Sequence, residues 1–354
     1  MRKLFILLAA VAFAFAFTTP AKADVNFSGM VSFETYMQSI SNDTPGTTDN
    51  DDLLWAMSTS GSRLTANFKE GDISALYEIR FNLTSYVRHW FASWNFGAGV
   101  LGIGQTWTPE FSCIGSVMRG DGAADPLDPA CSARIPFISV KFGGLMIAAG
   151  EVHTADVYGA PYTDYEITLP KLMASYNLNV AMVGLKFFGG INNYGQRDPV
   201  TDVSKDVDCY VWGITASAGF GPLTVKGMYW GGQNTVEYGA APPDQTGQFF
   251  NATYVAPTLY DTDMNAYGID VAYKVSDMIG VAAGYMAATQ ELDAPGTWED
   301  KTATYFVQAS ISLAKGVTLW PEYAVIDRKD VNLNGTKVEQ DTSTWIGVYW
   351  RIAF

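Results

Sequence analysis

The chain has 354 residues, 48% of them hydrophobic, 14% aromatic and only 16% charged, with 36 acidic residues against 22 basic ones. The net charge of −14 argues against nucleic acid as a partner, because binding phosphate requires a basic surface, and the aromatic content excludes a disordered chain. Beyond the N-terminus no apolar run reaches the roughly 18 residues of a membrane helix, which excludes a helical membrane bundle.

Residues 1–23 have the pattern of a secretory signal peptide. Two basic residues precede an apolar run over residues 4–17, and Ala21-Lys22-Ala23 supplies the small residues of a cleavage site. The apolar run is too short to span a bilayer comfortably. We therefore expect Sec-type export, cleavage after Ala23, and a single mature domain over residues 24–354 with a net charge of −17.

The rest of the chain alternates apolar and polar residues in segments of about ten, as the strands of a membrane β-barrel do. In the last segment, Ile346, Val348, Trp350, Ile352 and Phe354 share one face, opposite Gly347, Tyr349, Arg351 and Ala353. The pattern predicts sixteen strands, at residues 25–39, 53–68, 72–83, 87–96, 99–106, 135–143, 145–153, 170–177, 180–191, 207–220, 222–231, 263–275, 278–290, 302–313, 316–327 and 342–354.

The connections between these segments fall into two alternating classes. Tight turns such as Gly143-Gly144 and Asn177-Leu178-Asn179 alternate with connections that are mostly long and polar. Outer-membrane barrels show this asymmetry, and their even strand number closes the sheet without an edge in lipid. We predict an all-β fold, a transmembrane 16-stranded antiparallel barrel with short periplasmic turns and long external loops, wide enough to hold a water-filled channel.

These features together resemble the general diffusion porins of the Gram-negative outer membrane, which are 16-stranded and trimeric. The first strand begins Val25-Asn26-Phe27-Ser28-Gly29, and the terminal Trp350, Ile352 and Phe354 are similar to the signal read by the barrel-insertion machinery. The resemblance implies an outer-membrane location among lipid and lipopolysaccharide, passive diffusion of ions and small hydrophilic solutes, and a homotrimer. A short second external loop, around Thr84 to Val87, departs from the family, so trimerisation would rest on the apolar barrel walls.

The resemblance also implies that the third external loop, residues 107–134, folds into the lumen and narrows it. That stretch is the first long one without period-two patterning, and long unstructured loops in compact folds are usually functional. An ordinary surface loop is the alternative. With this loop, the candidate constriction residues are Arg63, Arg80, Arg88, Glu110, Arg119, Asp121, Asp125 and Asp128.

Alternation places a further set of charged residues on the lumen wall: Glu34, Glu78, Lys141, Lys171, Lys186, Lys226, Asp270, Lys274, Glu322 and Arg351. Acidic loop residues facing Arg63 and Arg80 would create a transverse field across the waist, although simple solvated lumen residues are the alternative. Arg88 has the parity of the lipid face, which would turn His89 inward. Either a β-bulge or a position at the rim would explain Arg88.

Three cysteines permit three pairings, and the sequence alone does not choose among them. The favoured disulfide joins Cys113 to Cys131, because it would tie down the third loop, and it would be unusual for the family. Cys209 would then be the odd thiol.

No cofactor is predicted. The acidic first loop, with Asn42, Asp43 and residues 49–52, could attract calcium, but such a run is more often a solvated loop and its spacing fits no EF-hand. His89 and His153 have no metal-binding spacing, and no Ser/His/acid set stands out, so the chain is not expected to be an enzyme.

Two other functions stay open. A substrate-selective channel could take anions such as phosphate along the lysine-rich wall, or sugars along lumen aromatics, for which Trp345 and Tyr349 alone are too few. From another class, a structural or adhesive barrel could display the long loop over residues 232–262.

Overall fold

The computed structural model describes residues 24–41, 50–58, 61–81, 86–110, 112–118, 134–155, 164–197, 204–240, 252–255, 258–296, 298–333 and 335–354. The expected signal peptide and most of the expected third loop lie outside these ranges. Among the described residues, no helix combines the length and apolarity needed to cross a bilayer.

A single antiparallel sheet closes on itself as a barrel. β1 (Asp24–Ser41) pairs with β3 (Arg63–Glu70) along its first half and with β2 (Asn50–Met57) along its second, so β2 and β3 form one interrupted wall strand. The wall continues with β4 (Ile73–Arg80), β5 (Tyr86–Asn95), β6 (Val100–Trp107), β7 (Arg134–Phe142), β8 (Leu145–Gly150), β10 (Lys171–Val180), β11 (Val183–Ile191), β14 (Tyr210–Phe220), β15 (Leu223–Gln233), β18 (Thr262–Lys274), β19 (Ile279–Leu292), β20 (Trp298–Ala314), β21 (Val317–Arg328) and β24 (Thr342–Ala353).

Closure comes from the pairing of β1 with β24, which runs from Met30 opposite Ala353 to Ser41 opposite Thr342. The prediction of a closed, sixteen-stranded antiparallel barrel is confirmed. One predicted turn is misplaced: β10 and β11 pair through Leu178 and Leu185, so the chain reverses at Ala181 rather than at residues 177–179. The apolar alternation of β10 simply continues for three more residues.

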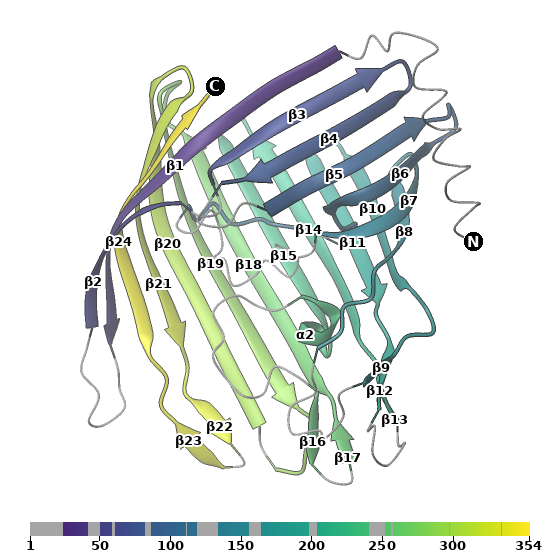
Figure 1. Cartoon of the computed structure of the whole chain (residues 1–354). Coiled ribbons are helices and arrows are strands. Elements are labelled where there is room, and N and C mark those ends of the chain that lie inside the picture. The colour runs from purple at the N-terminus through teal and green to yellow at the C-terminus, as the bar shows by residue number, and fades with distance from the viewer. Residues whose placement is uncertain are drawn as a thin grey trace.

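The two ends of the barrel differ (Figure 1). Tight turns lie at the end where β1 begins and the chain finishes, and Gly71, Gly143, Gly221 and Gly316 supply their positive φ angles. At the other end, two small sheets lie beyond the wall: β9 (Asp164–Glu166) with β12 (Tyr194–Arg197) and β13 (Ser204–Val207), and β16 (Thr253–Val255) with β17 (Thr258–Tyr260). The hairpin of β22 (Val331–Leu333) and β23 (Thr336–Val338) extends the barrel sheet there, because β22 pairs with β20.

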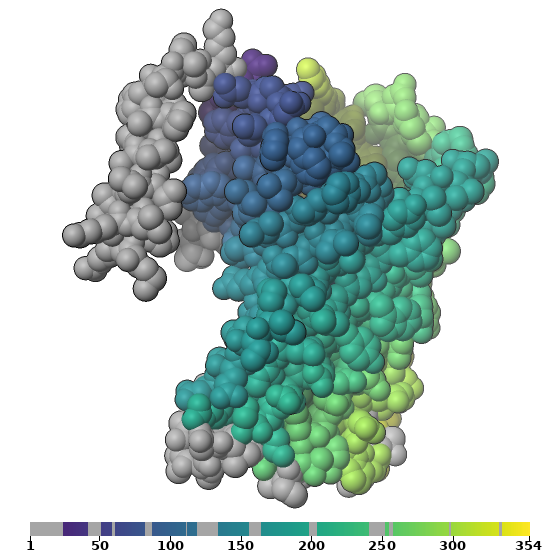
Figure 2. Space-filling model, turned by 90° about the vertical axis from the view of Figure 1, so that its right-hand side faces the viewer, coloured from purple at the N-terminus to yellow at the C-terminus, as the bar shows by residue number. Residues whose placement is uncertain are grey.

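The outer wall is apolar, as lipid requires. On β7, Ile138 is 60% exposed, while its neighbours Phe137 and Ser139 are each 4% exposed because they point inward. Large outward side chains such as Leu53, Trp55 and Ile103 repeat this pattern on other strands. Figure 2 shows this wall from the side, with the blue to teal strands lying next to one another across it.

The interior is not uniformly hollow. A buried apolar cluster joins wall residues of β14 to β24, among them Trp230, Trp345 and Tyr349, to residues that the connections carry inward. Those inward residues include Ile114 and Val117 after β6, and Tyr238 of the short helix α2 (Thr235–Tyr238) between β15 and β18. Part of the wide lumen is therefore packed with protein.

Candidate functional site

After β6 ends at Trp107, the chain turns into the barrel and reaches the opposite wall. The described part of this connection, residues 108–110 and 112–118, is called the third-loop segment. The backbone N–H of Ser116 donates to Asp270 Oδ2 on β18 at 2.9 Å, and that of Met118 donates to Glu322 Oε2 on β21 at 2.7 Å. The segment therefore lies across the lumen, since its anchors belong to strands far from β6.

Further contacts fasten the same segment strand by strand. Ser112 Oγ donates to Thr215 Oγ1 on β14 at 3.3 Å, and Lys226 Nζ on β15 donates to the carbonyl of Ile114 at 3.4 Å. Gln308 on β20 donates to the carbonyl of Ser116. Trp345 Nε1 donates to Glu322 Oε1 at 2.9 Å, so the aromatic residues of β24 help to seat the loop rather than line a solute track.

The start of the third-loop segment is tied to a second inward element. Glu110 is 1% exposed, and its Oε1 accepts a hydrogen bond from Tyr238 OH at 3.0 Å and lies 3.5 Å from Lys171 Nζ. Lys171 Nζ also donates to the Tyr238 carbonyl at 2.7 Å and sits 3.6 Å from the centre of the Tyr238 ring. This buried knot joins β10, the third-loop segment and α2.

Residues 234–240 together with Ala252, here called the α2 segment, are held by hydrogen bonds on several sides. Asn192 Nδ2 donates to the carbonyls of both Glu237 and His153, and Asn234 Oδ1 accepts from the Thr262 N–H. The Glu237 carboxylate accepts from the Ala252 N–H at 2.7 Å. Because Glu237 is fully buried, its pKa is raised to about 7.

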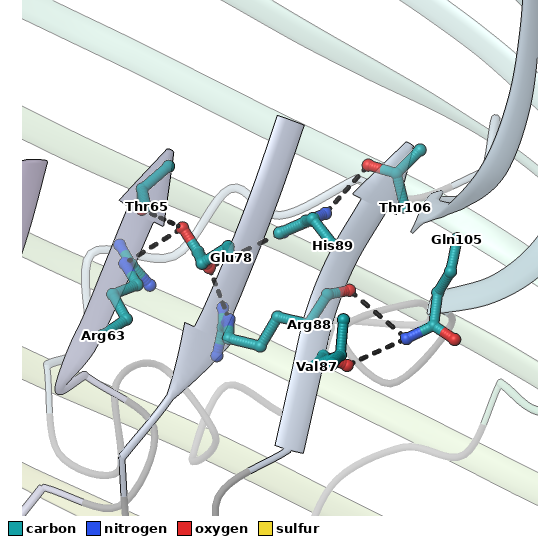
Figure 3. Close-up of polar contacts among 8 residues, drawn as sticks. All are labelled: Arg63, Thr65, Glu78, Val87, Arg88, His89, Gln105 and Thr106. Atoms are coloured by element: carbon teal, nitrogen blue, oxygen red, sulfur yellow. Dashed lines mark hydrogen bonds and ion pairs between the residues drawn. The ribbon is translucent and has the colours of Figure 1, made fainter. Parts of the chain in front are cut away.

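A group of arginines lines another part of the wall, on β3, β4, β5 and β7. Figure 3 draws Arg63 and Arg88 of this group beside Glu78. We call Arg63, Arg80, Arg88 and Arg134 the basic arc. Arg63 and Arg80 are direct cross-strand partners. The β4–β5 pairing shifts register between Glu78 and Ile79, so Arg88 is the extra residue of a β-bulge, and both Arg88 and His89 are 5% exposed. Of the two explanations for Arg88, the bulge is the one observed.

Glu78 lies at the centre of the arc. Its Oε1 accepts from Arg88 Nε at 2.8 Å and lies 3.8 Å from His89 Nε2. Its Oε2 accepts from Thr65 Oγ1 at 2.8 Å and lies 3.7 Å from Arg63 Nε.

Trp107, where β6 meets the third-loop segment, supports the arc from the other side. The Arg134 guanidinium stacks 3.6 Å from its ring centre, and the His89 ring meets it edge-on at 5.7 Å. His89 Nδ1 is also 2.9 Å from Thr106 Oγ1. Arg134 was not predicted from the sequence, because the predicted strand began one residue later. The alternation of inward and outward residues gave no reason to select Trp107.

A cavity of about 490 Å³ lies between the third-loop segment and the turn end of the barrel. It is lined by Ser116 and Met118 from the segment and by hydroxyl side chains of the wall, such as Thr224, Ser310 and Ser312. Apolar side chains such as Ala272, Met278 and Trp320 complete the lining, so the lumen continues below the loop as a cavity of mixed polarity.

The other candidate residues are dispersed. Lys141 and Lys274 are exposed, with Lys274 paired to Asp277 at a turn, while Lys186 and Arg351 lie over aromatic rings and Glu34 is buried. Arg119, Asp121, Asp125 and Asp128 lie outside the described residues. Glu110 has Lys171 and Tyr238 as its partners.

The predicted disulfide is not supported. The described residues contain no disulfide: Cys113 is exposed, and Cys209 is buried in the apolar cluster with its Sγ 3.9 Å from the Val207 carbonyl. Cys131 lies outside the described ranges, as does the acidic stretch over residues 42–49. Within the part of the chain that the structure describes, no group of three or more His, Cys, Asp or Glu residues could hold a metal ion.

Solved structures of similar fold are outer-membrane proteins. The channel DcaP of Acinetobacter baumannii is 17% identical with a TM-score of 0.72, covering 96% of this chain and 99% of that one. The anion-selective porin from Comamonas acidovorans is 18% identical with a TM-score of 0.58, covering 94% and 100%. OmpT of Vibrio cholerae, in its trimer form, is 14% identical with a TM-score of 0.58, covering 94% and 99%. No curated protein matches the sequence.

The family comparison decides the identity. The model of the Gram-negative porin family matches residues 8–331, most of the chain. The predictions of an outer-membrane location and of a non-enzymatic role are confirmed. The chain belongs to the Gram-negative porin family, and it forms an outer-membrane channel through which small solutes diffuse.

Proposed function

We propose that this porin prefers anions and that its solutes pass along the basic arc. The observation that carries the proposal is that the acidic and the basic side chains of the lumen have different partners. Asp270 and Glu322 accept backbone N–H groups of the third-loop segment, and Glu110 pairs with Lys171 in a buried knot. These carboxylates are engaged away from the arc, so they offset its cations little.

The physical reason is local. Fixed cations at a narrow waist with low-dielectric walls raise the concentration of mobile anions there and lower that of cations. The net charge of −14 does not oppose this, because charges farther away than about 8–10 Å are screened at physiological ionic strength. The solved anion-selective porin has the same fold, which agrees with the proposal.

A preference for sugars has less support. Trp345 and Tyr349 are fully buried, and Trp345 is occupied in binding Glu322 beneath the third-loop segment. Solutes in the lumen would not reach their rings.

We further propose that three copies assemble as a homotrimer through their apolar outer walls. The trimer form of OmpT supports this by analogy of fold. Native mass spectrometry of the detergent-solubilised protein tests it, since a monomer mass at all concentrations would contradict the trimer.

The test of the proposed function is the reversal potential of the refolded protein in a planar bilayer under a KCl gradient. We expect the sign that chloride permeation produces, and we expect the potential to grow as salt is lowered, because screening weakens. A potential of the cation sign would overturn the anion preference. Absence of conductance from folded, inserted protein would favour the structural or adhesive alternative, and flux that saturates with phosphate would favour a binding channel.

A further inference from the structure

We infer that Glu78 is a built-in counter-ion of the basic arc, which sets how tightly the waist holds a passing anion and is thereby a specificity-determining residue of the channel. This inference rests on the proposed anion preference and deepens it. Among the residues drawn in Figure 3, Glu78 is the one carboxylate.

The geometry fixes this carboxylate between two arginines, Arg63 and Arg88. It is 8% exposed, it accepts hydrogen bonds from Arg88 Nε and Thr65 Oγ1 at 2.8 Å each, and Arg63 and His89 lie within 3.8 Å of it. The bond from Thr65 holds Oε2 from the β3 side, while Arg88 holds Oε1 from the β5 side. The carboxylate therefore stays in place instead of swinging toward solvent.

The position of Glu78 also reduces the repulsion between two arginines of the wall. Arg63 and Arg80 face each other across β3 and β4, and like charges in such cross-strand pairs are destabilising. Glu78 lies two residues before Arg80 on the same face of β4 and directly opposite Thr65. It thus lowers the repulsion within the arc.

The consequence for transport follows from what a channel must do. A permeating ion has to bind well enough to enter and weakly enough to leave. Arginine forks bind carboxylates and phosphates strongly, often through two parallel hydrogen bonds. Because Arg88 already donates to Glu78, a passing anion must compete with that fixed carboxylate. The arc attracts anions without trapping them.

The variant Glu78→Gln tests this, because it keeps the side-chain shape and removes the charge. We expect the chloride-over-potassium permeability ratio to rise roughly twofold or more. We also expect conductance to saturate at lower KCl and added inorganic sulfate to block more strongly. The matched control is Glu166→Gln, which removes the same charge from an exposed pair with Arg197 on the small external sheet, and it should leave all three quantities unchanged.

Two further variants separate the effect of charge from an effect on folding. Arg88→Gln should lower the permeability ratio, and the double variant Arg88→Gln/Glu78→Gln should exceed Arg88→Gln alone. Heat-modifiable gel mobility verifies that each barrel is folded. If Glu78→Gln alone does not fold, the comparison of the double variant with Arg88→Gln answers the same question.

The inference would be overturned if folded Glu78→Gln protein had the same permeability ratio, the same KCl dependence of conductance and the same block by sulfate as the unaltered protein. A carboxylate with only a structural role would change the stability of the barrel and none of these three quantities. Failure of the proposed function is seen separately, as a cation-sign reversal potential in the unaltered protein.

Discussion

The basic arc and the opposite side of the lumen are built from the same period-two strands, yet they treat charge in opposite ways. On β3 to β7 the inward arginines surround a single carboxylate, Glu78, and lie beside Trp107. On β14 to β24, here called the filled half, the inward carboxylates Asp270 and Glu322 are covered by the third-loop segment and accept its backbone N–H groups. The difference arises from what covers the wall.

Which face of its strand a lumen residue occupies, and whether solutes can reach it, are separate properties. Covering protein separates a carboxylate that accepts backbone N–H groups from the water path. The arc keeps its cations next to one another, so the electrostatic character of the channel is expected to follow the arc and not the total charge of the wall.

The largest effect is expected from removing the arc itself. In the quadruple variant Arg63→Gln/Arg80→Gln/Arg88→Gln/Arg134→Gln, Glu78 would become the dominant fixed charge at the waist. The chloride-over-potassium permeability ratio should fall by an order of magnitude and the reversal potential should change sign. Lys337→Gln, on the β22–β23 hairpin where the exposed Lys337 pairs with Asp330, is the control. An unchanged reversal potential would show that solutes do not pass along the arc.

The barrel itself was predictable from the sequence, because each wall strand carries its own alternation. Sixteen strands, their order and most of their ends follow from that local pattern. The α2 segment was not predictable, since residues 232–262 lack a period and the segment is held by contacts with residues far away in the sequence, such as Asn192, Lys171 and Glu110.

For the candidate site residues, the alternation along each strand identified which side chains point inward but not which groups they contact. Lys171 was expected as a solvated wall residue and lies buried against Glu110 and Tyr238. Arg88 needed a bulge that spacing alone could not reveal. The predicted disulfide is not supported, and the separation of two cysteines along the chain could not decide it, since a disulfide depends on their distance in space.

The second largest effect is expected from the buried knot that borders the filled half. Lys171→Met leaves Glu110 as an uncompensated buried charge, which typically costs about 3–5 kcal/mol. We expect the barrel to unfold at a lower temperature, seen as a shift in gel mobility on heating, and we expect noisier channel currents. Both follow because the third-loop segment and the α2 segment lose the ion pair that holds them together. Adding Glu110→Gln to Lys171→Met should restore much of the loss. If the single and double variants behave alike, the ion pair does not couple the two segments.

A pH effect should distinguish the filled half from the arc. The pKa of Glu237 is raised from 4.5 to about 7, mainly by burial and slightly by Asp261, while the Ala252 N–H acts in the opposite direction. A carboxyl with a raised folded-state pKa favours the seated segment fully below pH 4.5, and this contribution declines with rising pH until it is lost above about 7. At about 1.4 kcal/mol per pKa unit, the change amounts to about 3 kcal/mol at most.

We therefore expect current noise, or protease cleavage within the α2 segment, to increase between pH 5 and pH 8. Glu237→Gln keeps an acceptor for the Ala252 N–H and has no charge to lose, so it should remove this pH dependence. An identical pH profile in the variant would assign the effect to another group.

The smallest effect is expected from a single anchor of the third-loop segment. Asp270→Ala removes the acceptor of the Ser116 N–H, which costs about 1–3 kcal/mol when a buried donor loses its partner. The bonds to Glu322, Gln308 and Lys226 remain, so the segment should stay in the lumen with more frequent excursions. Mean conductance should rise slightly while the reversal potential stays the same, because the arc is untouched. Asp164→Ala, at an exposed position of β9, is the control. A shift in selectivity without a change in conductance would mean that Asp270 itself contributes charge to the solute path, and the contrast between the two halves would no longer hold.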